Sequence, residues 1–350
     1  MDFAIVGAGF TGLAAAARLR QLAPGKSVIV LETDRVGAGA SGRTGGIPLA
    51  ESAAGDLPGL GDVLASFAAA LRDLQIECDF SLTGAWEIGR RGKGLANSPI
   101  DWQDSGRLRV VREVPGGTLD PGKLVGGLAR AAHGHGAMIF ENTAVDSVDW
   151  GEHLVVNVAL GQDGRREKIV AERILLATNA SSLRLAGLDS STHPKLALAA
   201  LTARVSEELL QAVGLAERKP FYTVDFPYLW GRVCRDNSIM WGAGLLDPPD
   251  SGDVGQINLA NEEASQAFNL LEQRVRSLHP ALKGIRFTHY WGGPILFRDN
   301  WRPVFANHRH SSRAIILGAY AGHGVALSVH LGCWAAEALL GRRDLPDWGS

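Results

Sequence analysis

The chain begins Met1-Asp-Phe-Ala-Ile-Val-Gly-Ala-Gly-Phe-Thr-Gly12, and this stretch decides the fold. The apolar run from Phe3 to Val6 has the length of a buried strand, and the Ala-, Leu- and Arg-rich residues after Gly12 favour a helix. Gly-x-Gly-x-x-Gly at such a turn is typical of Rossmann dinucleotide-binding units. Gly7 permits the tight turn, Gly9 lets backbone approach a pyrophosphate, and Gly12 lets the helix pack on the strand.

An acidic residue follows at the expected distance. The second strand, Val28 to Leu31, ends at Glu32, which is placed to accept hydrogen bonds from ribose hydroxyls. Its charge would repel a 2′-phosphate, so NADP is disfavoured even with Arg35 nearby. The phosphates are expected at the helix N-terminus, where free N–H groups and the helix dipole favour an anion. The sequence therefore predicts dinucleotide binding.

A second run of small residues, Gly37-Ala-Gly-Ala-Ser-Gly-Arg-Thr-Gly-Gly46, distinguishes FAD from NAD. A flavin ring extends past the sheet and is buried against backbone that carries few side chains, whereas NAD has no need of such a loop. We therefore expect FAD, with Arg43 at the flavin or the pyrophosphate. The alternatives are a flexible linker and a solvated Arg43.

A third group of motifs lies near the C-terminus. Trp291-Gly-Gly293 and Asn300-Trp-Arg-Pro303 precede a predicted strand, Ala314 to Leu317, which runs into Gly318-Ala-Tyr-Ala-Gly-His-Gly-Val325 and a last helix. Gly-His-Gly is poor helix sequence unless a ligand requires it. We expect this helix N-terminus to face the flavin edge on which negative charge collects during reduction. The alternative is a purely structural strand and helix.

Composition bounds the remaining possibilities. The 350 residues carry a net charge of −2, and 46% are hydrophobic, so neither nucleic acid nor an anionic membrane is an expected partner. Cys78, Cys234 and Cys333 are far apart, which predicts no metal site and no disulfide framework and favours a reducing, cytoplasmic location. The strand at Phe3 leaves no room for a signal peptide, and no stretch has the length of a membrane span.

Further segments match a known family. In chain order the matching pieces are Gly7 to Gly12, Glu32, Gly39-Ala-Ser-Gly-Arg-Thr-Gly-Gly46, Gly116-Gly-Thr-Leu-Asp-Pro121, Glu141-Asn-Thr-Ala-Val145, Leu175-Leu-Ala-Thr-Asn-Ala180, Trp291-Gly-Gly293 and Gly318 to Val325. With these pieces the chain resembles the FAD-dependent D-amino-acid-oxidase superfamily, which includes glycine oxidase, sarcosine oxidase and γ-glutamylputrescine oxidase-like enzymes. The pieces span nearly the whole chain, and they specify the superfamily rather than a substrate.

The resemblance implies an α/β architecture of two discontinuous domains. A Rossmann-type FAD-binding domain, three-layered with a mostly parallel sheet, is expected from residues 1–50, 115–187 and 284–350. An inserted α+β substrate domain with a mostly antiparallel sheet is expected from residues 51–114 and 188–283. The resemblance also implies hydride transfer to flavin N5, a backbone contact from Val145 to adenine, and Thr178 and Asn179 near the cofactor.

Several positions depart from the family pattern. Thr44 stands where many relatives carry Asn beside the flavin. The strand after Trp291-Gly-Gly293 holds Ile295 rather than a carboxylate-binding Arg, and Ala326 stands near the position where sarcosine oxidases carry a carboxylate-binding Lys. No Cys is placed to hold the flavin, so we expect FAD to be non-covalent. Fast oxidases of the sarcosine type also carry a Lys over the flavin, and we place Met240 or Trp241 there, so oxygen is expected to be a slow acceptor.

The site residues form two sets. The predicted cofactor contacts are Gly7, Gly9, Thr11, Gly12, Glu32, Thr33, Arg35, Ala40, Ser41, Arg43, Thr44, Gly45, Gly46, Val145, Ala177, Thr178, Asn179, Gly293, Gly318, Tyr320, Gly322, His323, Gly324 and Val325. The candidate catalytic and substrate-binding residues are His323, Tyr222, Tyr228 and Arg232. Tyr222, Tyr228 and Arg232 belong to the aromatic run from Phe221 to Arg232. Its aromatic walls suit an amine through cation–π attraction, although the run is also ordinary strand and core sequence.

Three functions remain open at this stage. The first is hydride removal from the C–N bond of a small amine or amino acid, followed by hydrolysis of the imine. The second is FAD-dependent oxidation of a 2-hydroxy acid. The third is a flavin subunit of a larger dehydrogenase, with the polar stretch Arg90 to Gly106 as a docking loop. Oxygen or a redox partner would accept the electrons.

Overall fold

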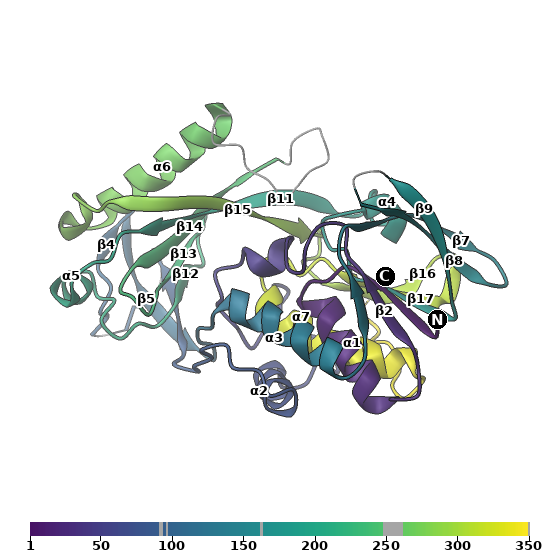
Figure 1. Ribbon diagram of the computed structural model, residues 1–350. Helices are drawn as coiled ribbons and strands as arrows, with labels where there is room; N and C mark the ends of the chain where they lie inside the picture. The colour runs from purple at the N-terminus through teal and green to yellow at the C-terminus, as the bar shows by residue number, and fades with distance from the viewer. Residues whose placement is uncertain (91–93, 96, 162–163, 248–261, 349–350) are drawn as a thin grey trace.

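The computed structural model describes residues 1–90, 94–95, 97–161, 164–247 and 262–348. A six-stranded sheet and an eight-stranded sheet organise these residues, and a three-stranded sheet covers part of the first. In Figure 1 the six-stranded sheet and its helices occupy the right-hand half, and the eight-stranded sheet occupies the left-hand half.

The six-stranded sheet is almost entirely parallel. Its strands are β1 (Phe3–Val6), β2 (Val28–Leu31), β6 (Met138–Phe140), β10 (Arg173–Leu176), β16 (Val304–His308) and β17 (Ser311–Gly318). The order across the sheet is β16-β17-β10-β1-β2-β6, and β16 pairs antiparallel with β17 while the other neighbours pair parallel. β1 and β2 are buried along their whole length, as expected for parallel strands covered on both faces.

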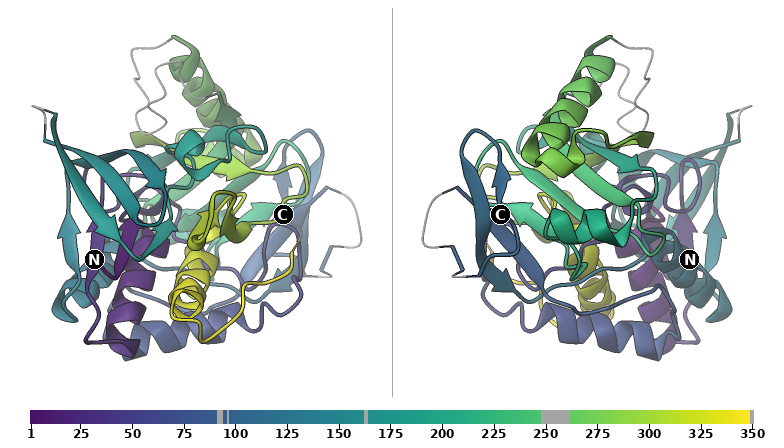
Figure 2. Two further views of the ribbon diagram at one scale, coloured as in Figure 1. Left: turned by 90° about the vertical axis from the view of Figure 1, so that its right-hand side faces the viewer. Right: turned by 90° about the vertical axis from the view of Figure 1, so that its left-hand side faces the viewer.

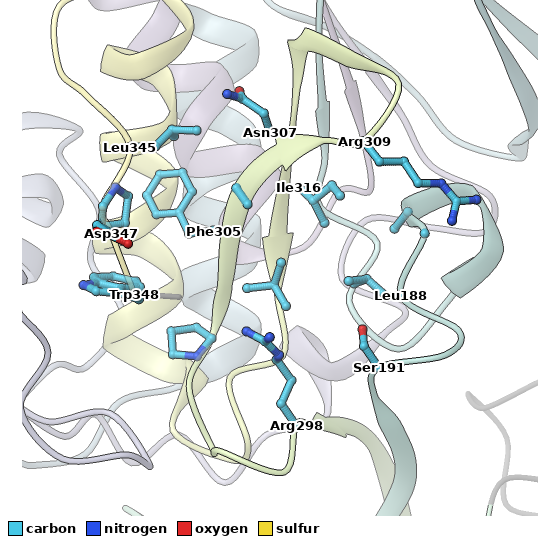
Figure 3. A pocket seen from close by; sticks show the side chains of 16 residues that line it. Leu188, Ser191, Arg298, Phe305, Asn307, Arg309, Ile316, Leu345, Asp347 and Trp348 are labelled. Atoms are coloured by element: carbon cyan, nitrogen blue, oxygen red, sulfur yellow. The ribbon is translucent and has the colours of Figure 1, made fainter. Parts of the chain in front are cut away.

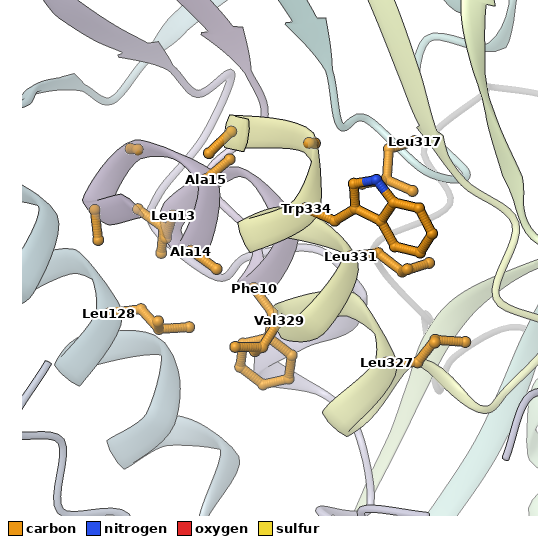
Figure 4. Packing of buried hydrophobic residues seen from close by; sticks show 14 of the residues in the cluster. Phe10, Leu13, Ala14, Ala15, Leu128, Leu317, Leu327, Val329, Leu331 and Trp334 are labelled. Atoms are coloured by element: carbon orange, nitrogen blue, oxygen red, sulfur yellow. The ribbon is translucent and has the colours of Figure 1, made fainter. Parts of the chain in front are cut away.

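Four helices belong to one face of this sheet: α1 (Phe10–Leu22), α2 (Val63–Asp73), α3 (Pro121–Gly134) and α7 (Gly324–Leu339). α1 and α7 approach closely because the residues between them are small. A Cβ at Gly332 would lie 2.5 Å from the backbone oxygen of Thr11. Figure 4 shows Phe10 and Leu13 of α1 in the same apolar cluster as Val329 and Trp334 of α7.

The opposite face of the six-stranded sheet packs against an antiparallel meander. Its strands are β7 (Thr143–Trp150), β8 (Leu154–Leu160) and β9 (Arg165–Ala171). Strand alternation divides the sheet residues between the two cores: Ile5 lies in the helical core, and Ala4 and Val6 lie in the core beneath the meander. The result is the three-layered arrangement that the sequence predicts.

The eight-stranded sheet is mostly antiparallel. Its strands are β3 (Ala85–Gly89), β4 (Trp102–Gln103), β5 (Arg107–Val114), β11 (His193–Thr202), β12 (Phe221–Thr223), β13 (Leu229–Val233), β14 (Ile239–Leu246) and β15 (Phe287–Phe297). The order is β15-β11-β14-β13-β12-β3-β5-β4, with one parallel pair, β12 and β3. The predicted α/β class with a second, antiparallel sheet is confirmed.

The outer face of this sheet is covered by α6 (Glu262–Leu278), with α5 (Glu207–Ala212) and η2 (Pro280–Leu282) nearby. Phe268, Leu271, Val275 and Leu278 form the buried stripe of α6 and share a core with Trp241. Figure 2 shows α6 at one end of the molecule and α1, α2 and α7 at the other, with the sheets between. The inner face of the eight-stranded sheet is therefore the one that meets the six-stranded half.

Two elements pack differently from the expected domain boundaries. α2 falls within the expected substrate segment 51–114, yet Phe67 and Leu71 are buried in the core of the six-stranded sheet, where α2 packs on α7. β15 falls within the expected FAD-binding segment 284–350, yet it pairs along its length with β11 in the eight-stranded sheet. Apolar periodicity predicts the presence of each element, whereas its packing partner depends on contacts distant in sequence.

Two kinds of feature are missing from the described ranges. No helix there combines the length and the apolar character needed to cross a bilayer. In the same ranges, no three His, Cys, Asp or Glu side chains gather closely enough to hold a metal ion.

Candidate functional site

The first glycine-rich turn joins β1 to α1. Gly7 has φ +105°, and a Cβ at Gly12 would lie 2.0 Å from the Gly7 backbone oxygen, so both positions exclude a side chain. α1 begins at Phe10 with Gly9 as its N-cap and with no side-chain cap. The Phe10 N–H donates to Ser41 Oγ at 2.9 Å, which links this turn to the second glycine-rich run. The helix N-terminus is thus built closely on backbone, as an anion site requires.

Glu32 lies directly after β2 and beside this turn. One carboxylate oxygen accepts the Ala8 N–H at 2.8 Å, and the other accepts the Asp34 N–H at 3.1 Å. Arg35 points elsewhere: its side chain is 78% exposed and pairs with Asp34 at 3.6 Å. Of the predicted cofactor contacts in this segment, Glu32 therefore lies against the first glycine-rich turn, whereas the Arg35 side chain lies in solvent.

The meander reaches the same end of the sheet. The Thr143 N–H donates to the Glu32 backbone oxygen at 2.7 Å, which holds the start of β7 against the end of β2. Val145 follows two residues later, partly buried against the core beneath the meander, and Thr33 is exposed. This places Val145 near Glu32, on the side where the resemblance expects the adenine.

The second glycine-rich run lies between the two halves of the molecule. Ala40–Gly42 form a short 3-10 helix, η1, and the Arg43 Nε–H donates to the Ala38 oxygen at 2.8 Å. The Trp291 Nε1–H of β15 donates to the Arg43 oxygen at 2.9 Å, and a Cβ at Gly293 would lie 3.4 Å from the Arg43 Cβ. These contacts join the run directly to the eight-stranded sheet.

The carboxyl ends of β1, β10 and β17 meet next to this run. The Ala177 N–H donates to the Val6 oxygen at 2.9 Å, and Asn179 Oδ1 accepts the Ala319 N–H at 3.1 Å. Thr178 lies between them, and its hydroxyl is buried with no hydrogen-bond partner among the described residues. Ligands of open α/β sheets bind outside these carboxyl ends, so the unpaired hydroxyl marks the expected place.

The last turn, Gly318 to Val325, has an unusual backbone. Ala319, Ala321 and Gly322 have φ of +58°, +50° and +88°, and left-handed Ala residues are uncommon outside functional sites. Tyr320 Oη and Thr11 Oγ1 are 2.7 Å apart in a buried hydrogen bond that ties this turn to α1. His323 is the N-cap of α7, and burial holds its pKa below the usual value.

A single row of side chains crosses the inner face of the eight-stranded sheet. Successive strands pair Trp291 with Ala199, Ala199 with Gly242, Gly242 with Trp230, Trp230 with Tyr222, Tyr222 with Glu87, and Glu87 with Arg112. Directly paired residues share a face, so all of these positions face the same way. The neighbours Phe221 and Trp241 belong to the opposite, apolar core.

This row, from Trp291 to Arg112, lies against the second glycine-rich run. The Trp230 ring lies over Gly242 and also beside Gly45, where a Cβ would come within 2.5 Å of a ring carbon. Arg232, on the same strand face, donates its Nε–H to the Gly45 oxygen at 2.5 Å. The predicted flavin loop and the predicted substrate residues are thus brought together.

The family comparison agrees with this arrangement. The model of the DAO family, described as FAD dependent oxidoreductase, matches residues 2–338. The chain belongs to this family. Gamma-glutamylputrescine oxidoreductase of Escherichia coli is 27% identical, with 97% of this chain and 84% of that protein aligned. A probable oxidoreductase, OrdL, of Haemophilus influenzae is 26% identical over 97% of this chain and 83% of its own length.

Solved structures share the fold. L-proline dehydrogenase from P. horikoshii has a TM-score of 0.78 at 17% identity, covering 98% of this chain and 94% of that one. Glycine oxidase from Geobacillus kaustophilus has a TM-score of 0.72 at 18% identity, covering 99% and 96%. As a member of the matched family, the chain is an FAD-dependent oxidoreductase.

The residues at the sheet ends fit FAD. Side chains are excluded at Gly7 and Gly12, and the N-cap of α1 is Gly9, which has no side chain. The buried Thr178 hydroxyl has no hydrogen-bond partner among the described residues, and a polar cofactor group would supply one. Gly45 presents bare backbone toward the Trp230 ring. The positions predicted as cofactor contacts largely gather here, apart from the exposed Thr33 and Arg35.

Not every candidate substrate residue joins the row. Tyr228 is 38% exposed in the loop before β13, where its ring lies 4.2 Å from that of exposed Phe226 and its carbonyl accepts from Arg274. Of the two residues considered for the position over the flavin, Met240 pairs with Arg232 on the inner face. Trp241 points into the apolar core.

The proposed docking stretch, Arg90 to Gly106, is only partly described, since residues 91–93 and 96 lie outside the described ranges. Its two ends are held together: the Arg90 Nη2–H donates to Asp104 Oδ2 at 2.7 Å, and Asp104 also accepts from Arg274 at 2.6 Å. These contacts fix the base of the stretch on the outer side of the sheet, where α6 packs.

A cavity of about 410 Å³ opens elsewhere, along the edge strand β16. Figure 3 shows Phe305 and Trp348 on one side of it, Leu188 and Ser191 on the other, and Arg298 at its rim. Ser191 and Leu188 follow the short helix α4 (Leu183–Ala186). Arg298 therefore lines a cavity separate from the row.

Two charged residues of the row escaped sequence reasoning: Glu87 and Arg112. Glu87 is 7% exposed within the apolar strand Ala-Trp-Glu-Ile-Gly. A charge at a buried strand position is seldom left unpaired, and this was the available signal. The identity of its partners, Arg112 and Tyr222, depends on pairing between strands far apart in sequence.

Proposed function

We propose that the chain oxidises the C–N bond of a small amine or amino acid. The observation that carries this proposal is the contact of Trp230 with Gly45, because it sets an aromatic wall of the substrate sheet against the flavin loop. The names of the E. coli relative and of the glycine oxidase neighbour, both enzymes of nitrogen compounds, support the same chemistry.

The chain's own contribution is to hold and enclose the reactants. When bound, FAD supplies the acceptor for a hydride from the carbon that bears nitrogen, after which water hydrolyses the imine. Trp230 excludes water from one side and offers a π face that attracts a cationic nitrogen. His323 stays neutral near pH 7 because burial lowers its pKa, so the start of α7 adds no positive charge through this side chain.

The apolar positions bear on the substrate class. Ala326 is fully buried in α7, and Ile295 lies on β15, so neither predicted carboxylate position offers a charge. A carboxylate buried without a partner is strongly disfavoured. We therefore propose a preference for amines whose reacting nitrogen is remote from any carboxylate, over glycine-like substrates.

A second candidate is oxidation of the C–O bond of a 2-hydroxy acid. Arg232 favours it, because one Nε–H is held by Gly45 and the guanidinium has further donors that suit a carboxylate. Both candidates share the same cofactor and differ in the group that the row must recognise.

Anaerobic flavin reduction by a panel of compounds tests the proposal. The panel contains putrescine, γ-glutamylputrescine, glycine, sarcosine, D-alanine, L-proline and lactate. We expect the first two to bleach the flavin faster than glycine, sarcosine or D-alanine. Bleaching by lactate alone would establish the second candidate, and efficient bleaching by glycine would reject the preference for remote amines.

A further inference from the structure

Glu87 holds two groups at once on the inner sheet face. Its Oε1 accepts the Tyr222 hydroxyl at 2.9 Å and Arg112 Nη2 at 2.7 Å, and its Oε2 accepts Arg112 Nε at 2.8 Å. Glu87 is 7% exposed, while the Arg112 side chain is 60% exposed. The three residues thus form a chain from solvent, through a buried carboxylate, to a partly buried phenol.

This arrangement fixes the direction of the hydrogen bond. Hydrogen bonds from Arg112 hold the pKa of Glu87 below its usual value despite burial, so the carboxylate is ionised and can only accept. Burial, followed by the interaction with Glu87, raises the pKa of Tyr222. The Tyr222 hydroxyl must therefore donate to Glu87, and its oxygen keeps free lone pairs for a different donor.

Tyr222 is a direct neighbour of the aromatic wall in the row. Tyr222 pairs directly with Trp230, whose ring lies against Gly45 of the flavin loop. We propose that Tyr222, oriented by Glu87, is a specificity-determining residue that accepts a hydrogen bond from the protonated nitrogen of the substrate. This inference rests on the proposed amine oxidation and names the group that selects an amine within it.

The charges around Tyr222 point the same way. Glu51 acts electrostatically on both Tyr222 and Arg112. Since Arg112 and Glu87 neutralise each other as a bidentate pair, the negative charge that acts on Tyr222 is that of Glu51, while Arg232 carries a positive charge beside Gly45. An ammonium group gains from the charge of Glu51 and from the lone pairs of Tyr222, whereas a carboxylate would face the same lone pairs and would need Arg232 as its partner.

The test compares Tyr222→Phe and Glu87→Gln with the wild-type holoenzyme. The matched control is Arg107→Gln. Arg107 lies on the same strand as Arg112, and the substitution removes its exposed ion pair with Asp101. KM and kcat are measured with γ-glutamylputrescine and putrescine and with each further amine of the panel that reduces the flavin. Bound FAD per chain and the melting temperature are measured for every variant.

For Tyr222→Phe, we expect KM to rise about 10- to 100-fold, the range for losing a hydrogen bond to a charged group, with a smaller change in kcat. Glu87→Gln should also raise KM, because an amide can donate to the Tyr222 oxygen and occupy its lone pairs. For the same reason, this variant should bind putrescine less selectively over 1,4-butanediol when the two compounds are compared as competitive ligands. Arg107→Gln should leave KM unchanged.

Two results separate the inference from the function on which it rests. If amines reduce the wild-type flavin and Tyr222→Phe keeps FAD with KM unchanged, the inference is overturned and amine oxidation stands. If no amine reduces the wild-type flavin, the proposed function falls and the inference falls with it. Should Glu87→Gln lose FAD or stability, Tyr222→Phe alone decides, because it removes one hydroxyl and preserves the ring.

Discussion

Tyr320→Phe removes one buried hydrogen bond that joins the two cofactor-facing turns. Tyr320 Oη lies 2.7 Å from Thr11 Oγ1, and the two residues are 9% and 6% exposed. Thr11 belongs to the first turn of α1, and Tyr320 belongs to the turn before α7. The substitution keeps the ring, so packing against α1 is preserved and only the hydroxyl is lost.

The magnitude follows from the partner left behind. Thr11 Oγ1 would remain buried without its partner, and such a group costs about 1–3 kcal/mol in free energy of unfolding. With an unfolding entropy of about 2.1 cal/mol/K per residue, a chain of this length should lose about 1–4 °C of melting temperature. In Thr11→Val/Tyr320→Phe both polar partners are gone, so the double variant should lose less than the sum of the single variants.

Thermal unfolding of the flavin-free chain, followed by circular dichroism, measures these differences. Tyr228→Phe is the matched control, because Tyr228 is 38% exposed. Its free energy of unfolding should change by no more than about 0.5 kcal/mol, and its melting temperature should stay close to that of the wild type. Strict additivity of Thr11→Val and Tyr320→Phe, or a Tyr320→Phe melting curve identical to wild type, would refute the proposed coupling of the two turns.

Five further outcomes are expected. Acid precipitation should release free FAD, and a chromophore that stays in the pellet would instead show covalent attachment. Gly9→Val should abolish flavin retention, since a Cβ at Gly9 already lies 2.8 Å from Ser41 Oγ, and Glu32→Ala should weaken FAD binding by about 1–3 kcal/mol in a flavin titration. Oxygen should be a slow acceptor because Met240 on the inner face carries no charge, and peroxide formation at the rate of dye reduction would contradict this. Burial lowers the pKa of His330 in the folded chain, so that below about pH 6.5 this side chain takes up protons more readily in the unfolded chain. The melting temperature should therefore fall between pH 7.5 and pH 5.5, and it should fall less in His330→Gln.

Local signals predict the cofactor half of the molecule well. The first turn, Glu32 and the last turn each combine a strand end, glycines and a helix start within a few residues, so the physical requirement is visible in one stretch. The structure places Glu32 on the Ala8 N–H and leaves Thr178 Oγ1 unpaired at the same sheet end. Exposed Arg35 shows the limit of proximity in sequence, because a long side chain near a site still turns toward solvent.

Predictions for the substrate half were weaker because its site is assembled from strands far apart in sequence. Successive side chains of β14 point to opposite faces of the sheet, so Met240 faces inward once Trp241 is known to lie in the apolar core. Tyr222 and Tyr228 look alike in the sequence, and only pairing with Glu87 distinguishes the partly buried phenol from the exposed one. The sheet to which β15 belongs likewise follows only from its pairing with β11, which is distant in the sequence.

Register connects the stability of the second sheet with its chemistry. Phe221 is fully buried and pairs with Trp86 on the apolar face, and this pairing forces Tyr222 to face Glu87 on the other. A shift of β12 by one residue would place the Tyr222 hydroxyl in the apolar core without a partner and would set Phe221 against a buried carboxylate. Both changes are unfavourable, so the apolar face selects the register that gives Tyr222 its acceptor role. The core residues that look unrelated to function therefore hold the site in place, because no local feature of the three-residue strand could do so alone.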